Sequence, residues 1–391
     1  MTLNFQQVFD KIKQIGIGAQ ARQEKLDALR KRASLLLDAW ADKAAELGPK
    51  VERASRADAS LRCALPLDEP LNAHLQPGPA STAETTLIAA DGSQVVPDRH
   101  APVLYGLINV GAVIIPNGSE NAPLVLTDSN LSFDDEVANW TDSLVALRRD
   151  LAERKKLLEL SREYPPPVVT LTDGPLQLWE SHESDEVIGY EKALGEYLTI
   201  LSQLQERGVI TAGYVDKPAS NLVVRLLEVA ITPENEFDRL HNHHPLSGVT
   251  DLWLFNQILR SGERSAIFAL QARSKAIYRG PLALHFFYLN VGQPGHPRSV
   301  RIEIPAWVAG NKLDIDLLHT MLLEQSAIMG AKPYPYILHR AHETAVITFQ
   351  EKQQIEQMLA IELRRSGGEV GEKSGKQTSK DSSHAGKKRF R

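Results

Sequence analysis

The sequence predicts an α/β fold in which a mixed sheet is flanked by helices. Short runs rich in β-branched residues, each bounded by turn residues, recur from residue 86 onward. Stretches with apolar residues at helical spacing separate several of these runs, as expected for strands joined by crossover helices. The chain has 391 residues, of which 42% are hydrophobic and 24% charged, enough for two average domains or one large domain with appendages.

The composition narrows the possible classes of function. Lys and Arg number 44 against 49 Asp and Glu, so the formal net charge is -5. This excludes a uniformly basic nucleic-acid coat but permits a local basic groove. The single cysteine, Cys63, excludes a disulfide scaffold and a thiolate cluster for zinc or iron–sulfur. Because the N-terminus lacks a continuous apolar stretch and no run approaches the ~20 residues of a membrane span, we expect a cytoplasmic protein without a membrane segment.

Residues 1–65 are expected to form a helical arm. Apolar residues recur there at three- and four-residue steps, namely Phe5, Val8, Phe9, Ile12, Ile15, Leu26, Leu29, Leu35, Leu36 and Leu37. Two interpretations are open: the arm packs on the body of its own chain, or it serves dimerisation or partner docking. Residues 66–85 combine Pro, Gly, Ser and Thr without periodicity, which predicts a linker.

Residues 86–350 are expected to form the main domain. Its predicted strands are 87–96, 103–115, 123–128, 167–172, 209–215, 282–290 and 299–307. Its predicted helices are about 137–162, about 185–206, one that starts near Ser220, and about 313–329. A final helix is expected from His342 to Arg364, so that residues 351–366 form the end of the C-terminal helix.

The segment 367–391 is expected to be a disordered, basic tail. It is rich in Gly, Ser and Lys, holds one aromatic residue, and carries seven Lys or Arg against three Asp or Glu. Such a tail suits a non-specific DNA tether, but a solvated terminus has the same composition.

Two Asp-Gly pairs follow predicted buried strands and are the first candidates for chemistry. Asp91 lies in LIAADGSQVV and Asp173 in VVTLTDGPLQLW. An acidic residue at the end of an apolar strand is costly to bury unless its charge is used, and the following glycine lets another group approach the backbone. If the two strands are neighbours, the carboxylates meet at one edge of the sheet and suit Mg²⁺ or Mn²⁺. Each pair alone would fit an ordinary turn.

A third carboxylate is expected from the helix between these strands. Glu153 and Glu159 are the candidates, and helical geometry does not choose between them. A solvent-exposed position is the alternative interpretation for either residue.

A cluster of Tyr and His occurs near the C-terminus, in KPYPYILHRAHETAVI. An imidazole binds metal when neutral and stabilises phosphate charge when protonated, so His342 is a candidate together with Tyr334. The alternative is an aromatic-rich helix start with partly buried imidazoles. His241, His243 and His244 lack the ligand spacing of a structural zinc site and are expected in a surface loop. The absence of GxxxxGK[ST] excludes a phosphate-binding loop for ATP hydrolysis.

The order of these motifs resembles the NurA nuclease family. The resemblance rests on Asp91-Gly92-Ser93, a helix carrying Glu, Asp173-Gly174-Pro175-Leu176, Lys217 after the next strand, and the run from Arg301 to Trp307. It is most specific in the closing motif YPxxLxxAH, which the chain matches at every fixed position from Tyr334 to His342. The resemblance covers roughly residues 86 to 350.

The resemblance implies a fold, an activity and partners. NurA-family proteins have an RNase H-like core, form homodimers, and degrade DNA with Mn²⁺ or Mg²⁺. They act with the hexameric ATPase HerA in processing DNA ends for repair. A chain without its own ATP-binding loop would need such a motor to advance along duplex DNA.

The resemblance also assigns roles to residues. Asp91, Asp173 and a helix Glu would hold the divalent ions, with His342 as a further ligand or phosphate-stabilising group. Tyr334 would position the scissile phosphate.

For the third acid we favour Glu153 over Glu159, because Arg149 and Glu153 form an R-x-x-x-E pattern that resembles the family's helix. Lys217 and Ser93 are the expected DNA contacts. Two other classes of function remain open: a non-catalytic adaptor that clamps DNA or regulates the motor, and an RNA-directed nuclease.

Overall fold

The computed structural model describes residues 4–82, 84–98, 103–116, 122–133, 136–137, 140–178 and 187–367. The chain divides into two compact units. The first unit is Met1–Ala80 with Gly213–Pro333, and the second is Ser81–Ala212 with Tyr334–Arg391. The basic tail predicted at 367–391 lies outside the described residues apart from Gly367.

The second unit contains a mixed sheet with the strand order β6-β5-β2-β3-β4. The strands are β2 (Thr86–Val95), β3 (Tyr105–Pro116), β4 (Leu124–Phe133), β5 (Val168–Asp173) and the first half of β6 (Ile210–Val215). β2, β3 and β4 form an antiparallel meander, whereas β5 runs parallel to β2. An antiparallel meander extended by a parallel strand is the arrangement of an RNase H-like sheet. The predicted mixed α/β fold is therefore confirmed.

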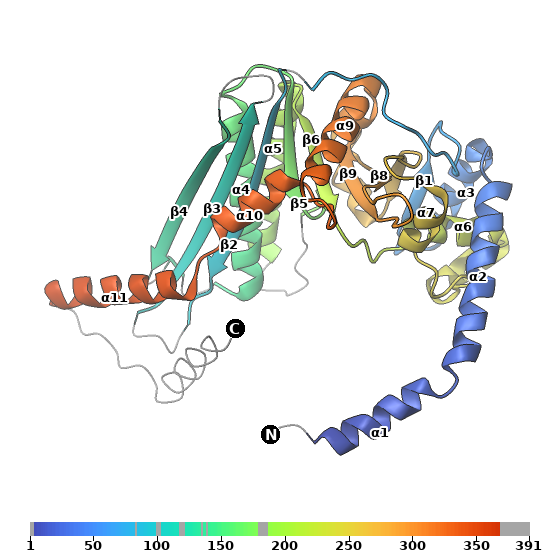
Figure 1. Ribbon diagram of the computed structural model, residues 1–391, viewed down its shortest axis with the longest axis horizontal. Helices are drawn as coiled ribbons and strands as arrows, with labels where there is room; N and C mark the ends of the chain where they lie inside the picture. Colours follow the sequence, from blue (N-terminus) through green and yellow to red (C-terminus); the bar gives the residue numbers. More distant parts are fainter. Residues whose placement is uncertain are drawn as a thin grey trace. The chain divides into compact units, whose positions relative to one another are not determined.

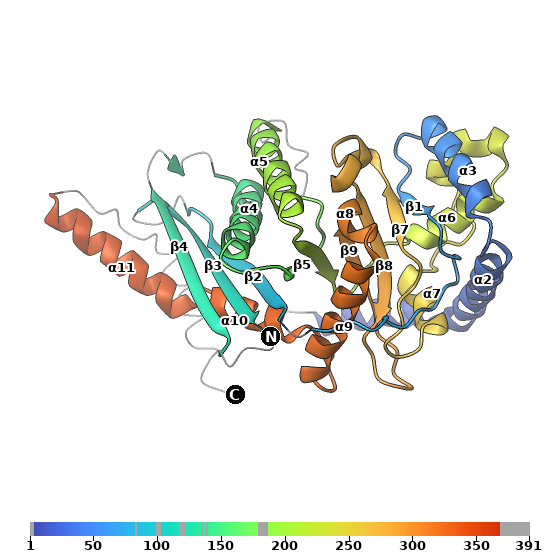
Figure 2. The same ribbon diagram turned by 90° about the horizontal axis from the view of Figure 1, so that it is seen from above.

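Helices cover both faces of this sheet (Figures 1 and 2). One face carries α4 (Asp142–Ser161) and α5 (Val187–Glu206), and the opposite face carries α10 (Tyr336–Ala345). The apolar residues of β2, β3 and β5 are buried between these layers, including Ile88, Ala90, Val113, Val169 and Leu171. The alternation of side chains along β2 thus points successive residues towards α4 and towards α10.

The C-terminal helix differs from the prediction. A single helix from His342 to Arg364 was expected, but the chain forms α10 and then α11 (Phe349–Arg365). Thr348 starts α11 with a capping box: its side chain accepts from the Glu351 amide, and its own amide donates to Glu351 Oε2 over 2.7 Å. The prediction of one continuous helix from His342 is wrong, because residues 346–348 are not helical and this cap begins a new helix that includes residues 351–365.

The first unit contains an antiparallel sheet with the strand order β1-β7-β8-β9-β6. Its strands are β1 (Cys63–Pro66), β7 (Phe268–Gln271), β8 (Leu284–Asn290), β9 (Ser299–Pro305) and the second half of β6. Its helices are α1 (Phe5–Gly16), α2 (Ala19–Ala39), α3 (Ala44–Ala57), α6 (Leu222–Ile231), α7 (Asp251–Ile258), α8 (Ala306–Ala309) and α9 (Lys312–Ile328), with short 3₁₀ helices η3 (Glu234–Asn242), η4 (Arg273–Ala276) and η5 (Gly280–Leu282). None of the helices in the described ranges combines the length and apolar character needed to cross a bilayer.

The expected N-terminal arm is three helices with different environments. α3 buries Leu47, Val51 and Ala54 and packs on α6 and β1 of the same unit, and the end of α2 buries Leu37. Only α1 leaves its whole apolar stripe exposed. Much of the segment 1–65 thus belongs to the first unit's core rather than forming a separate arm. Similarly, residues 213–333 of the expected main domain lie in the first unit.

Candidate active site

Two neighbouring parallel strands bring the positions of Asp91 and Asp173 together. β2 and β5 pair in register up to Ala90 and Thr172, and the next residue on each strand is the aspartate. Residues in register on adjacent parallel strands lie on the same face of the sheet. The side chain of Asp173, the last residue of β5, is exposed. The neighbouring strands expected from the two Asp-Gly motifs are present.

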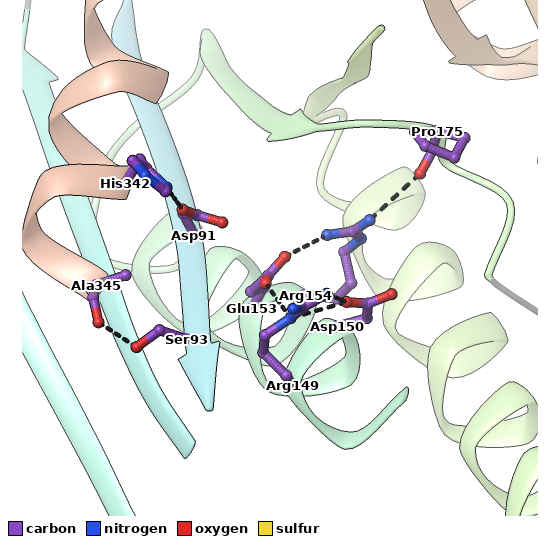
Figure 3. Close-up of polar contacts among 9 residues, drawn as sticks. All are labelled: Asp91, Ser93, Arg149, Asp150, Glu153, Arg154, Pro175, His342 and Ala345. Carbon is purple, nitrogen blue, oxygen red and sulfur yellow. Dashed lines mark hydrogen bonds and ion pairs between the residues drawn. The ribbon is translucent and has the colours of Figure 1, made fainter. Parts of the chain in front are cut away.

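Helix α10 places His342 against Asp91. His342 Nδ1 lies 2.7 Å from Asp91 Oδ2 (Figure 3), although the two residues are 251 positions apart in the chain. The Asp91 side chain is 18% exposed and that of His342 is 62% exposed. This contact leaves Nε2 of the imidazole as the nitrogen that can meet a ligand.

A glycine on the neighbouring strand allows this approach. Gly111 of β3 pairs directly with Asp91 in the antiparallel register. A Cβ at Gly111 would lie 2.5 Å from the backbone nitrogen of Ala345 and 2.8 Å from the carbonyl oxygen of Ala341. The backbone of α10 therefore rests directly on β3, and any larger residue would push the helix away.

Two polar side chains of the sheet form hydrogen bonds with the backbone at the C-terminal end of α10. Ser93 Oγ donates to the Ala345 carbonyl over 2.5 Å (Figure 3). The same Oγ accepts from the Ile347 amide over 3.1 Å. Asn109 Nδ2 donates to the same carbonyl over 2.7 Å. The hydroxyl of Ser93 is thus engaged in holding α10. A contact between Ser93 and DNA stays a prediction.

On the opposite face of β2, Gly92 lets α4 approach. A Cβ at Gly92 would lie 2.5 Å from Arg149 Cγ and 2.8 Å from Glu153 Oε1. The glycine of this Asp-Gly pair was expected to admit another group close to the backbone, and the α4 side chains occupy that space. Glu153 therefore reaches β2 from the face opposite to α10.

Glu153 is a buried carboxyl between two arginines. Its side chain is 7% exposed; Arg154 Nη1 donates to Oε2 over 3.0 Å, and Arg149 Nε lies 3.5 Å from Oε1 (Figure 3). Burial raises the pKa of the Glu153 carboxyl to about 8; Arg154 opposes the rise, while the charges of Asp150 and Asp91 add to it. Glu153 thus lies within electrostatic range of Asp91.

The structure separates the two candidates for the third acid. Glu159 is 60% exposed and forms an ion pair with Lys156 at 2.9 Å. Only Glu153 of these two approaches β2. The helix period could not distinguish them, because the choice depends on how α4 is rotated against the sheet.

The remaining candidates lie elsewhere. Tyr334 is half-buried, two residues before α10 and in the second unit. Lys217 is exposed and belongs to the first unit. Arg301 and Glu303, also in the first unit, form a buried ion pair at 2.8 Å. Sequence reasoning gave no role to Arg154, whose only signal was its position beside Glu153.

The side chains at this site have the chemistry of ligands for a divalent cation but are not already grouped around one. Within the described ranges, no three His, Cys, Asp or Glu side chains are already grouped so that they could hold a metal ion. Asp91 instead contacts His342, and Glu153 contacts the arginines. The chemistry of the donors does fit: carboxylate oxygens and one imidazole suit Mg²⁺ or Mn²⁺.

Substitution of Gly111 should separate His342 from Asp91 without removing either residue. We expect Gly111→Ala to destabilise the fold by about 1–3 kcal/mol, because the added methyl group meets α10 backbone that cannot rotate away. Thermal unfolding measures this loss. Gly195→Ala on α5, where a Cβ meets nothing within 4 Å, is the matched control and should not destabilise. Equal melting temperatures for the two variants would contradict the proposed close packing.

The fold and the site together define an RNase H-like α/β protein with acidic residues on adjacent central strands and a histidine beside them. The family model for the NurA domain matches residues 85–347. The chain belongs to the NurA family. Membership of this family supports a nuclease activity.

The solved structures that match this chain share little sequence identity with it. The catalytic domain of human Endonuclease V is 14% identical over 81% of this chain and 98% of that chain, with a TM-score of 0.34. Endonuclease V of Ciona intestinalis, solved with a 24mer DNA containing an inosine, is 11% identical over 79% of this chain and 96% of that chain, with a TM-score of 0.30. LC9-RNase H1 is 13% identical over 38% of this chain and 69% of that chain, with a TM-score of 0.21. No curated protein sequence is significantly similar to this chain.

Proposed function

We propose that this chain is a divalent-metal-dependent deoxyribonuclease that processes the ends of DNA double-strand breaks together with a HerA-like ATPase. The observation that carries the proposal is the contact between Asp91 on β2 and His342 on α10. The neighbouring parallel strand, β5, ends in Asp173. Glu153 supports it from the other face of β2. A non-catalytic DNA clamp would have no need of this set of acids.

In the proposed mechanism, Asp91, Asp173 and Glu153 would hold one or two Mn²⁺ or Mg²⁺ ions, with His342 as a further ligand or as a group that stabilises the phosphate. The bound cation would supply Lewis-acid stabilisation of the scissile phosphate and a water of lowered pKa. The Asp91 carboxylate orients the imidazole of His342 through Nδ1. Nε2 is then the atom that binds the cation or holds a proton towards the phosphate. Tyr334 would orient that phosphate, and Lys217 and Ser93 would contact the DNA backbone.

Removal of divalent ions tests the proposal. Purified wild-type protein should degrade linear duplex DNA with Mn²⁺ or Mg²⁺, lose that activity in a chelator, and regain it when the ion is added back. The same protein should leave RNA of matching sequence intact. Binding of DNA without cleavage at any ion concentration would support the adaptor instead, and preferential RNA cleavage would support the RNA-directed nuclease.

Two exposed apolar surfaces support the proposed partners. The stripe of α1 is exposed at Phe5, Val8, Phe9, Ile12 and Ile15. Strand β4 exposes its apolar side chains over most of its length, at Leu124, Val125, Leu126, Leu131 and Phe133. An exposed amphipathic helix and a long apolar strand at the end of a sheet are both typical protein-binding surfaces. We assign α1 to the HerA-like ATPase and β4 to the second copy in a homodimer.

A truncation tests this assignment. A chain lacking residues 1–18 should remain a homodimer by light scattering and should fail to co-purify with the ATPase. A longer truncation would remove Leu47 and Val51 of the first unit's core and would unfold the protein rather than test docking. Co-purification at the wild-type yield would refute the role of α1, and a monomeric full-length chain would refute the homodimer.

A further inference from the structure

Arg154 is a buried arginine that contacts the carboxyl group of Glu153. Its side chain, on α4, is only 8% exposed. Nη1 donates to Glu153 Oε2 over 3.0 Å, and Nη2 donates to the carbonyl oxygen of Pro175 over 3.4 Å (Figure 3). Pro175 lies two residues after Asp173, in the turn that leaves β5. One guanidinium therefore joins the helix that carries Glu153 to the turn that follows Asp173.

Tyr197 of α5 holds the same turn from a second direction. Its hydroxyl donates to the carbonyl oxygen of Leu176 over 2.7 Å, and the residue is fully buried. The Arg154 Cζ atom lies 6.0 Å from the centroid of the Tyr197 ring. Consecutive carbonyls of the turn, at Pro175 and Leu176, are thus bound by Arg154 and Tyr197. Gly174 begins the turn with φ of +97°, which permits the sharp change of direction after Asp173.

The planar fork of an arginine suits this bridging role. It presents several N–H groups in a fixed geometry, so that one side chain can reach a carboxylate and a carbonyl at once. A lysine keeps the charge but lacks the fork. A neutral side chain would leave the buried carboxylate of Glu153 without its closest counter-charge.

We propose that Arg154 is a positioning residue, which holds Glu153 and the turn after Asp173 in the arrangement that binds the divalent cation. This inference rests on the proposed metal-dependent nuclease. Arg154 acts through the two acids and touches neither substrate nor cation. Groups behind metal ligands set the orientation of those ligands, and their loss typically lowers metal affinity about 10–100-fold.

Mn²⁺ binding to the full-length protein without DNA tests this role. Free Mn²⁺ is followed by electron paramagnetic resonance for the wild type, Arg154→Met, Arg154→Lys and Tyr197→Phe, with thermal melting as the check on folding. Lys155→Met is the matched control, because Lys155 is the next residue on α4 but forms its ion pair with Glu196 at 2.6 Å.

We expect the Mn²⁺ dissociation constant to rise about 10–100-fold in Arg154→Met and less in Arg154→Lys. It should rise in Tyr197→Phe as well and stay within about twofold of the wild type in Lys155→Met. Unchanged Mn²⁺ affinity in folded Arg154→Met would overturn the inference while leaving the proposed nuclease intact. Should Arg154→Met fail to fold, unchanged affinity in both Arg154→Lys and Tyr197→Phe overturns it. Absence of Mn²⁺ binding by the wild type would instead overturn the proposed function.

Discussion

Asp91→Ala should lower the rate of DNA cleavage by more than about 100-fold, because it removes a proposed metal ligand and not merely a group behind one. The same substitution removes the partner of His342 Nδ1, so the imidazole loses its orientation as well. The rate is measured with linear DNA and Mn²⁺, on protein freed of contaminating nucleases. Single-turnover conditions with DNA in saturating protein separate the chemical step from binding.

Glu159→Ala is the matched control for this loss. Glu159 is also an acidic residue of the second unit, but it is 60% exposed and pairs with Lys156 at 2.9 Å. Its removal should change the cleavage rate less than about twofold, since an exposed ion pair contributes little to stability. Cleavage at the wild-type rate by Asp91→Ala would remove the basis of the proposed mechanism.

The second large effect concerns stability. Asp251→Ala should destabilise the first unit by roughly 3–5 kcal/mol. Asp251 is fully buried; its carboxylate accepts from the amides of Val223 and Val224 over 2.9 and 2.8 Å and from Tyr288 Oη over 2.7 Å. The two amides belong to the first turn of α6, where a negative charge is also favourable to the helix dipole. Alanine would leave three buried donors without their acceptor.

Burial has a cost for Asp251 itself, since it raises the pKa of the carboxyl to about 6 while the three donors oppose that rise. Because the lost hydrogen bonds outweigh this cost of burial, thermal unfolding of Asp251→Ala should show a melting temperature about 10 °C below that of the wild type. Asp238→Ala, at an exposed position of η3, should leave it within about 2 °C of the wild type. A small shift for Asp251→Ala would indicate that water reaches the α6 amides and satisfies them.

Strand-level features were predictable from local sequence. The β-branched runs identified most strands of the second unit, and the Asp-Gly pairs in two of them marked Asp91 and Asp173 as candidates that would meet if those strands were neighbours. Strand β4 was predicted only to residue 128 and continues to Phe133, because its polar second half is held by pairing with β3. Short β1 and β7 were not predicted, since four residues carry no measurable alternation. The break between α10 and α11 has a local signal, the Thr-x-x-Glu capping box at Thr348, which the apolar periodicity of 342–364 obscured.

Features that depend on contacts between distant segments were not predictable. Gly111 had no signal at all, because its requirement comes from the backbone of a helix more than 200 residues later. Helical periodicity likewise could not choose Glu153 over Glu159, because the choice depends on the rotation of α4 against the sheet; the preference for Glu153 came from the family resemblance alone.

The fold class, the family and the types of side chain at the candidate site follow from the amino-acid sequence, because residue types and their spacing are properties of one continuous chain. Three contacts are visible only in the folded molecule: His342 lies on Asp91, Glu153 comes from the other face of β2, and Arg154 connects Glu153 to the turn after Asp173. These contacts are set by the packing of α4 and α10 on opposite faces of the sheet. No local propensity encodes that packing.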